Sequence, residues 1–414
     1  MNDARRLWVV SELYYPEQTS TGYFLTHIAE GLAKDFDVRV IAGQPGYSER
    51  TEKAPAQQFR NGVFVRRVWA TQFDKNRLLF RTINNLTFTL SVLFAALIRF
   101  RKGDQVLVVT NPPALPLCIS FAAKVRGVRG YLLVHDVYPE ILAATGLLKA
   151  NSWTYRILQK VMQRTFDAFE QVIVLGRDMA DIVASKLKEP SRITVIPNWA
   201  DVDEVMPIAK SDNAFRREHG LDGKFVIQFS GNIGRSHDIE LVLDAARSLQ
   251  DRADVAFMFI GGGGGASPLA TSTVRTMHNV TVLPRQSRER LPSMLASSDA
   301  TIISFVDGML GLSVPSRMYN IMAAGVPIIA SAHPSSELAK VVTEGKAGWV
   351  LPDRDVTTLV RLIREAAKPG NTEPAQRGAN GRKLAESTYS VRKVVASFKS
   401  VLSGGSSLYE PTSK

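Results

Sequence analysis

Short apolar runs alternate along the chain with longer amphipathic segments. In the first half, the runs predict strands at Leu7–Val10, Val38–Ala42, Val63–Val68, Gln105–Thr110, Tyr131–Val134 and Val172–Leu175. Between several of them a period near 3.6 residues predicts helices, such as Tyr23–Lys34 and Ala114–Arg126. Such alternation is typical of parallel sheets with helices on both faces, so we expect an α/β fold.

A second set of elements follows a Pro-, Asp- and Asn-rich break at Pro197–Asn213. It has predicted strands at Phe225–Phe229, Val255–Ile260, Val280–Leu283, Ala300–Ser304 and Pro327–Ala330, and helices at Glu240–Leu249, Leu291–Ala296, Ser316–Ala324 and Val356–Ala367. With 414 residues, the chain fits two doubly wound Rossmann-like domains facing a cleft. We place them at residues 1–205 and 206–385, followed by a helix at 386–402 that packs back toward the first domain and a mobile tail at 403–414.

One apolar stretch, Leu86–Ile98, stands apart from this rhythm. As a helix of 13 residues it would reach about 20 Å, short of the roughly 30 Å hydrocarbon core, so we do not expect it to span a membrane. It is either a buried helix of the first domain or an interfacial helix whose basic neighbours contact anionic headgroups. The two alternatives are compatible if one face of the helix packs in the domain and its edge contacts lipid. Those neighbours are Arg77, Arg81, Arg99, Arg101 and Lys102.

Charge and cysteine content limit the expected cellular compartment and the kind of binding partner. The single cysteine, Cys118, excludes an internal disulfide and fits a reducing compartment. No secretory signal peptide is visible at the start, so we expect a cytoplasmic protein. The net charge of +12 favours an anionic partner, either a phospholipid surface or a phosphorylated substrate. Nucleic acid is not expected, because no nucleic-acid module or basic face with stacking aromatic residues is present.

The segment from Leu312 to Pro327 holds a candidate phosphate site. Ser313 is a predicted N-cap, Pro315 lies in the first turn, and Gly325 suits the position after the helix. The free N–H groups of such a helix attract anions, and Arg317 adds a fixed positive charge. The alternative is an ordinary capped helix.

Two glycine-rich segments follow predicted strands of the second domain. The turn Ser230–Asp238 lets a ligand approach the backbone, and Arg235 or His237 can reach a diphosphate there. The run Gly261–Gly265 formally fits a dinucleotide-binding pattern, but Gln286 stands where the ribose-binding acid is expected. An NAD enzyme is therefore disfavoured, and the run is either a flexible loop or a place of close nucleotide approach.

The first domain offers two further candidates at strand ends. His135 ends the strand Tyr131–Val134 and can hydrogen-bond a sugar hydroxyl, with Asp136 or Glu140 orienting it or carrying charge. A packed histidine is the alternative. Gly22, at the start of the first helix, lets a phosphate or sugar come close. No paired aspartates or histidine clusters have metal-ligand spacing, so we expect no bound metal and no cofactor.

Three motifs carry a family resemblance. They are His135-Asp136-Val137-Tyr138-Pro139-Glu140, Ser230-Gly231-Asn232-Ile233-Gly234, and Val314-Pro315-Ser316-Arg317 with Ala323–Ala330. The chain resembles, over nearly its whole length, the family-4 retaining glycosyltransferases, in the branch that builds capsule, exopolysaccharide or O-antigen and includes colanic-acid-type enzymes.

The resemblance implies a GT-B fold and a hexosyltransferase-type enzyme. It implies a UDP-, GDP- or dTDP-sugar donor held by the second domain and a glycan acceptor, of the polyprenyl-diphosphate-linked kind, held by the first. It also implies metal-independent transfer with retained anomeric configuration. A lipid-linked acceptor places the protein peripherally on the cytoplasmic face of an anionic membrane. By position, catalysis would fall to His135 and Asp136, and donor binding to Gly22, Asn232, Arg235, Asp307, Ser316, Arg317 and Asn320.

The chain also departs from the family pattern. Two glutamates that the family usually carries eight positions apart are Leu312 and Asn320 here, and its usual Arg and Lys of the glycine-rich turn are Asn232 and His237. Two other functions therefore stay open: a partner protein that binds a nucleotide sugar without transferring it, and a nucleotide-sugar epimerase of the GT-B type.

Overall fold

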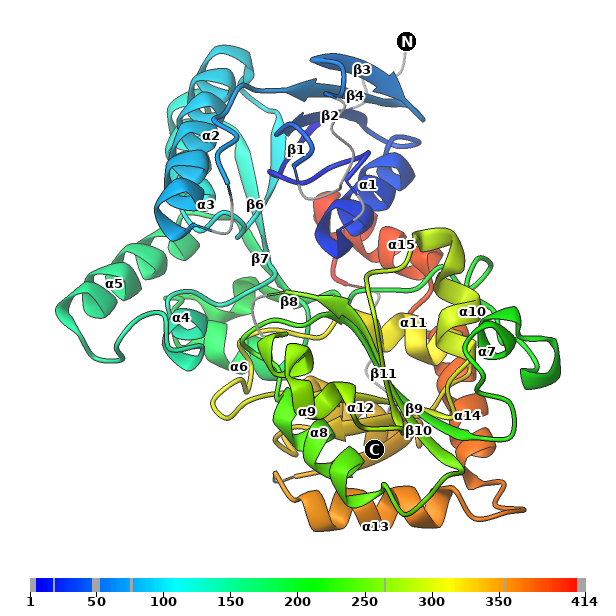
Figure 1. Cartoon of the computed structure of the whole chain (residues 1–414). Helices are drawn as coiled ribbons and strands as arrows, with labels where there is room; N and C mark the ends of the chain where they lie inside the picture. The colour runs from blue at the N-terminus through cyan, green and yellow to red at the C-terminus, as the bar shows by residue number, and fades with distance from the viewer. Residues whose placement is uncertain are drawn as a thin grey trace. The chain divides into compact units, whose positions relative to one another are not determined.

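The computed structural model describes residues 5–17, 19–46, 53–74, 77–263, 266–352 and 354–407. The chain divides into two compact units (Figure 1). Of the described residues, the first unit contains those up to Asn198, the short segment Gly311–Val314 and those from Val391 to Ser407; the second contains Trp199–Leu310 and Pro315–Ser390. Each is an α/β unit around its own largely parallel sheet, which confirms the predicted fold class.

The sheet of the first unit has eight strands in the order β3-β4-β2-β1-β5-β6-β7-β8. β3, which was not predicted from the sequence, pairs antiparallel with β4, whereas the other strands of this sheet pair in parallel. The two strands are joined by Asn61 and Gly62, whose positive φ angles of 45° and 83° are those of a tight hairpin turn. The strands are β1 (Arg6–Val10), β2 (Asp37–Ala42), β3 (Gln57–Arg60), β4 (Val63–Arg67), β5 (Gln105–Val109), β6 (Arg129–Val134), β7 (Gln171–Val174) and β8 (Ile193–Val195).

Helices cover both faces of this sheet (Figure 1). α1 (Ser20–Leu32) and α15 (Val391–Leu402) pack together on one face, where Gly31 leaves room for Val395 and the Lys399 Nζ atom lies 2.6 Å from Asp35 Oδ1. α2 (Leu78–Arg99) and α3 (Leu115–Arg126) pack together on the other face. The remaining helices are α4 (Glu140–Ala144), α5 (Trp153–Asp167) and α6 (Arg177–Ala184).

The sheet of the second unit has six parallel strands in the order β11-β10-β9-β12-β13-β14. They are β9 (Phe225–Asn232), β10 (Val255–Gly262), β11 (Val280–Leu283), β12 (Ala300–Ser304), β13 (Ile328–Ser331) and β14 (Gly348–Leu351). The helices are α7 (Ala214–Glu218), α8 (Ile239–Ser248), α9 (Ser272–Arg275), α10 (Leu291–Ala296), α11 (Arg317–Ala323), α12 (Glu337–Glu344), α13 (Val356–Ala366) and α14 (Glu373–Ser387).

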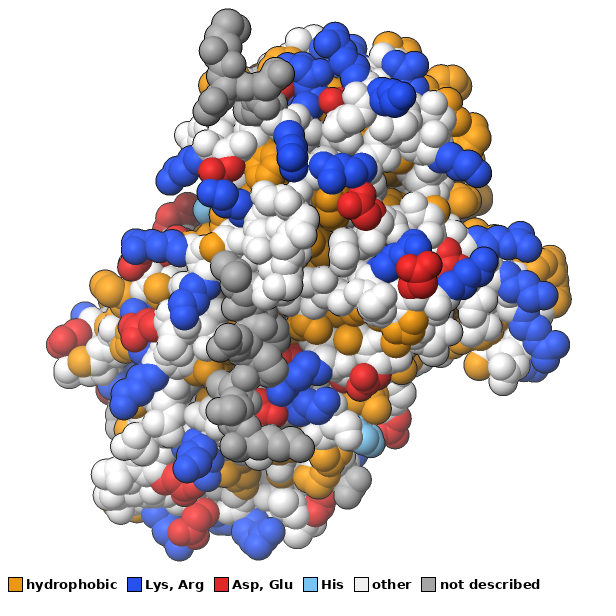
Figure 2. All heavy atoms as spheres, turned by 180° about the vertical axis from the view of Figure 1, so that it is seen from behind, with side chains coloured by type: hydrophobic (Ala, Val, Ile, Leu, Met, Phe, Trp, Pro, Cys, Tyr) orange, Lys and Arg blue, Asp and Glu red, His pale blue; other side chains and the backbone are white. Residues whose placement is uncertain are grey.

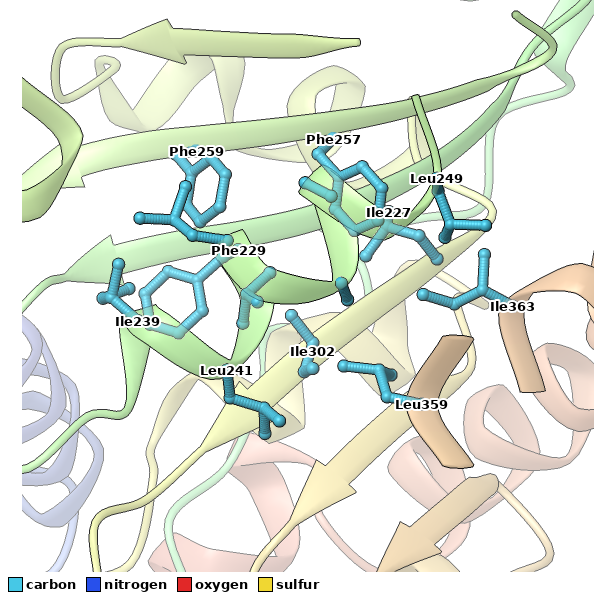
Figure 3. Packing of buried hydrophobic residues seen from close by; sticks show 14 of the residues in the cluster. Ile227, Phe229, Ile239, Leu241, Leu249, Phe257, Phe259, Ile302, Leu359 and Ile363 are labelled. Carbon is cyan, nitrogen blue, oxygen red and sulfur yellow. The ribbon is translucent and has the colours of Figure 1, made fainter. Parts of the chain in front are cut away.

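The core of this unit lies between the sheet and the helices α8 and α13. Figure 3 shows Phe229 of β9, Phe257 of β10 and Ile302 of β12 pointing toward Leu241 of α8 and Leu359 of α13. All five are at most 1% exposed. This apolar packing fixes the strands whose carboxyl ends carry the predicted donor residues.

The predicted length of the helix that contains the apolar stretch Leu86–Ile98 is wrong. α2 has 22 residues and reaches about 33 Å, because the helix begins eight residues earlier, through a less apolar turn that includes Arg81 and Asn84. Among the described residues, Leu79–Arg99 is long and apolar enough to cross a bilayer by length and composition, although core helices of soluble proteins can pass the same test. One side of α2 packs within the unit, since Phe88, Val92 and Ala96 are at most 2% exposed.

Candidate functional site

The carboxyl end of β6 carries His135 and Asp136 on a tightly held turn. The main-chain N–H groups of both residues donate to the Thr110 hydroxyl just past β5, at 3.1 and 3.3 Å. The next residue, Val137, donates its N–H to the Leu312 carbonyl at 2.9 Å. Thr110 is fully buried, so the turn rests on a fixed support. Sequence analysis missed Thr110; its only signal was a hydroxyl residue at the end of a buried strand.

The segment Gly311–Val314 is anchored to this turn within the first unit. Ser313 pairs with Asp136 in an antiparallel bridge and also hydrogen-bonds its carboxyl group. Gly311 donates its N–H to Asp178 Oδ2 at 3.1 Å, and its positive φ of 69° suits glycine. Ser313 therefore does not cap a helix as predicted: α11 begins at Arg317, and its N-cap, Ser316, makes no side-chain capping bond.

The His135 ring is not oriented by either neighbouring carboxyl group, contrary to the prediction. Asp136 bonds to Ser313, and Glu140 pairs with Lys186 and bonds to Tyr155. The buried Nε2 atom of His135 has no hydrogen-bond partner among the described residues. Burial lowers the pKa of His135 to about 4, so the ring is neutral near pH 7 and can accept or donate one hydrogen bond at that atom.

Gly22 lies in the first turn of α1, and the structure gives a packing reason for it. A Cβ atom there would lie 2.9 Å from the Glu17 carbonyl oxygen, inside contact distance. The Gly22 N–H points to Thr19 Oγ1, the N-cap of α1, at 3.4 Å. Contact between Gly22 and the donor stays a prediction.

In the second unit, Arg317 reaches the carboxyl end of β9. Its Nη1 atom donates to the Ser230 carbonyl at 3.0 Å, and its guanidinium carbon lies 4.4 Å from the Phe229 ring centroid. Burial lowers its pKa to about 9, yet no acidic side chain pairs with it in the part of the chain that the structure describes, and its Nε atom has no partner. A desolvated cation without a counter-ion is a strong attractor for an anion.

His237 completes this cluster. Its Nδ1 atom lies 2.9 Å from the Ser304 carbonyl and 3.2 Å from Arg317 Nη2. A proton on Nδ1 makes it a donor to Ser304, and the hydrogens of Arg317 Nη2 then stay available for a ligand. Burial and, secondly, the Arg317 charge lower the pKa of His237 to about 3, so the ring adds no positive charge near pH 7.

The glycines beside this cluster are strand residues. Gly261 and Gly262 extend β10 and pair with Gly231 and Asn232 of β9, so the flexible-loop interpretation is wrong for these two positions. A Cβ atom on Gly261 would lie 2.0 Å from the Gly231 carbonyl oxygen, so close strand approach requires glycine here. Gly264 and Gly265 lie outside the described residues.

The other predicted donor residues surround the ends of β9 and β12. Asn232, Arg235 and Asp307 are exposed, and Ser316 and Asn320 are partly exposed at α11. Gly325 follows that helix with a φ of 70°, as predicted. Among the described residues, no group of three or more His, Cys, Asp or Glu side chains could hold a metal ion.

The first unit also exposes an apolar face. On α2 it follows every fourth residue from Leu86 to Ile98, with Leu79 two turns earlier, and on α3 it repeats the spacing of four. We call these side chains the α2–α3 face: Leu79, Leu86, Leu90, Phe94, Ile98, Leu117, Phe121 and Val125, each 44–74% exposed. Figure 2 shows such hydrophobic side chains bordered by Lys and Arg at its upper right, where α2 and α3 lie. Between residues 77 and 135 the only acidic residue is the buried Asp104, so this face is surrounded by positive charge.

Acidification is expected to destabilise the fold through the two neutral histidines. Their pKa values of about 4 and 3 lie below the ordinary 6.5, so between these values the unfolded chain binds more protons than the folded one. The free energy of unfolding therefore falls as the pH falls, by up to about 1.4 kcal/mol per pH unit for each histidine. Urea denaturation at about pH 7 and about pH 5 measures this loss. In a variant with His135→Gln and His237→Gln it should be clearly smaller, and an unchanged loss would contradict the assignment.

Comparison with known proteins agrees with the fold and with the family resemblance. Residues 21–199 match the glycosyl transferase 4-like domain, and residues 211–384 match the glycosyl transferases group 1. The probable glycosyltransferase WbjE of Pseudomonas aeruginosa is 33% identical over 368 residues, covering 87% of this chain and 89% of that protein. The putative colanic acid biosynthesis glycosyl transferase WcaI of Escherichia coli is 27% identical, covering 85% and 90%.

A solved structure shows the same architecture. Anabaena HepE, in complex with UDP and glucose, superposes with a TM-score of 0.73 at 14% identity, covering 97% of this chain and all of that one. Two Rossmann-like units, two matching domain families and relatives that span most of the chain lead to one assignment. The chain belongs to the family-4 glycosyltransferases of the GT-B fold, in the branch of polysaccharide biosynthesis.

Proposed function

We propose that this glycosyltransferase moves a sugar from a nucleotide-sugar donor to a lipid-linked glycan, with retention of anomeric configuration and without a metal ion. The observation that carries the donor assignment is Arg317. It is a desolvated guanidinium with no acidic partner among the described residues, at the carboxyl end of a parallel sheet. Ligands of open α/β sheets bind at that edge, and a diphosphate supplies the missing negative charge.

The neighbouring residues complete the proposed donor site. Arg235 is exposed and free to add charge at the diphosphate, and Asn232 and Asn320 offer amide groups to the ribose or the sugar. Two arginines can stabilise the charge that develops on the leaving diphosphate, which is the part a metal ion plays in other transferases. Asp307, exposed after β12, is the proposed contact to the donor sugar.

In the first unit, His135 is the proposed catalytic group, with Asp136 beside it. The retaining transition state gathers positive charge on the sugar ring and negative charge on the leaving group. A neutral imidazole with an unpartnered Nε2 atom can hold a sugar hydroxyl in the reacting geometry. Asp136 fixes the turn through Ser313, so we assign its effect on transfer to the placement of His135.

A panel of donors tests the nucleotide assignment. A bound nucleotide sugar stabilises the fold by RT ln(1 + [L]/Kd), about 2.7 kcal/mol at a hundredfold excess over Kd. We expect one of the UDP-, GDP- and dTDP-sugars to raise Tm clearly above the others. UDP-sugars come first in the panel because HepE is known with UDP. No stabilisation by any of them at millimolar concentration would contradict a nucleotide-sugar donor.

The α2–α3 face supports peripheral attachment to the cytoplasmic face of the membrane. Its large side chains are exposed while the opposite side of α2 packs within the unit, which supports a helix that lies on a bilayer rather than crossing it. Basic residues around the face would contact anionic headgroups, each contributing about 1 kcal/mol at low salt. A lipid-linked acceptor lies in the bilayer, so the proposed acceptor-binding unit would reach it when the α2–α3 face is bound to that bilayer.

Vesicle co-sedimentation measures this attachment. Binding should rise with anionic lipid and fall at high salt, because salt screens exposed charges. Replacing Phe94 and Phe121 by serine, or Arg99, Arg101 and Lys102 by glutamine, should each weaken binding at least tenfold. If the wild-type protein does not bind anionic vesicles at low salt, the α2–α3 face does not attach the protein to a membrane.

A further inference from the structure

A second surface of the first unit has the character of an interfacial helix. α5 buries Met162 and Phe166 on one side. On the opposite side, Trp153 and Ile157, four residues apart, are 74% and 51% exposed. Leu147, in the loop before α5, is 49% exposed. The unit therefore leaves most of the Trp153 side chain uncovered.

Basic residues share the free side of α5. At 3.6 residues per turn, Arg156, Lys160 and Arg164 fall within a third of a turn of the line through Trp153 and Ile157. All three are exposed, and none is paired with an acidic side chain among the residues that the structure describes. No Asp or Glu occurs from residue 141 to residue 166. The free side of α5 is thus cationic and apolar at once.

We propose that this side of α5 is a second membrane contact that binds anionic lipid directly, with Trp153 inserted at the headgroup level. Tryptophan prefers the membrane–water interface, where its ring is half in hydrocarbon and its N–H is in contact with water. The unpaired basic side chains match the negative charge of acidic headgroups. The proposal rests on the membrane attachment proposed above, and adds a contact outside the α2–α3 face.

α5 and the α2–α3 face belong to the same side of the first unit. α5 packs against α3, and the chain segments around them carry the same excess of positive charge. In Figure 1, α5 reaches outward beside α3, and Figure 2 shows orange and blue side chains on the same projection at the right. Two contacts on one unit would fix its orientation on the bilayer, which a single helix face leaves free to rotate.

Glutamine at Arg156, Lys160 and Arg164 tests the electrostatic part. Each basic residue near an anionic surface contributes about fivefold to partitioning at low salt, so the triple variant should bind phosphatidylglycerol-containing vesicles about a hundredfold more weakly. The control removes three positive charges from α13 and the turn after it in the second unit, with Arg361→Gln, Arg364→Gln and Lys368→Gln, and should bind like wild type. Equal losses in both triple variants would mean that only net charge matters, and would overturn the proposal.

Trp153 gives a second readout that does not depend on affinity. In a Trp69→Phe background the other tryptophans are the buried Trp8 and Trp199 and the partly exposed Trp349 of the second unit. Brominated anionic lipids should quench this protein's fluorescence, and a further Trp153→Phe change should abolish most of that quenching. If wild type binds anionic vesicles but Trp153 is not quenched, the α5 proposal fails while the α2–α3 attachment stands. If wild type binds no vesicles, both fail.

Discussion

Replacing His135 with alanine is expected to lower kcat by about 100- to 1,000-fold while leaving the donor Kd within about threefold of wild type. The ring stands at the carboxyl end of β6, neutral, with a buried Nε2 atom that no described residue uses. A hydrogen bond from such a preorganised group strengthens as charge develops on the sugar. Removing it should therefore affect the transition state far more than the bound ground state.

The comparison variants separate this effect from a loss of structure. His278 is exposed in the second unit, so His278→Ala should keep full turnover. His135→Gln keeps a hydrogen-bonding group of similar reach and should recover part of the rate. If folded His135→Ala turns over at the wild-type rate, His135 is only a packed residue of the strand end.

Replacing Arg317 with alanine is expected to weaken nucleotide binding about 10- to 100-fold. A charge-assisted hydrogen bond to phosphate is worth about 1.5–3 kcal/mol, and the loss falls on Kd because the contact exists before reaction. Its guanidinium lies over Phe229 and donates to the Ser230 carbonyl, so its position is fixed before any ligand arrives. Isothermal titration with the preferred nucleotide measures the change.

Two further substitutions check that the charge and its geometry are responsible. Arg317→Lys keeps the charge but loses the planar fork, and should fall between wild type and alanine. Arg247 pairs with Asp244 on the surface of α8, so Arg247→Ala should bind nucleotide normally. Unchanged affinity in a folded Arg317→Ala protein would remove this residue from the donor site.

The sequence was sufficient for the central strands and for the edge strand β11, but not for the edge strands β3, β8 and β14. Strands such as β1, β10 and β13 carry continuous apolar runs because they are covered on both faces. β3 has the sequence Gln-Gln-Phe-Arg and lies at the sheet edge, so no apolar run identifies it as a strand. The sequence feature that predicts it is the Asn61-Gly62 pair, which is typical of a hairpin turn. A search for apolar runs alone does not detect this pair.

The candidate site shows a similar division. Residue type and position after a strand were enough to single out His135 and Arg317. Their surroundings depend on segments distant in sequence. Ser313 hydrogen-bonds Asp136 and does not cap a helix, and Arg317 lies against Phe229, about 90 residues earlier. Likewise α2 was underestimated because its first turns carry polar residues whose helical state is set by packing, as Asn84 shows by bonding Phe73 and Thr71.

The most direct test of the account follows labelled sugar from the nucleotide to lipid. The purified protein is incubated with each nucleotide sugar, labelled in the sugar, together with a lipid extract from cells that carry the gene. The account predicts label in the organic phase that depends on the extract, is lost with His135→Ala, and is released as a sugar with the donor's anomeric configuration. Nucleotide binding without transfer would indicate a non-catalytic partner protein, and a changed or freed sugar without added lipid would indicate an epimerase or hydrolase; either result would contradict glycosyl transfer to lipid.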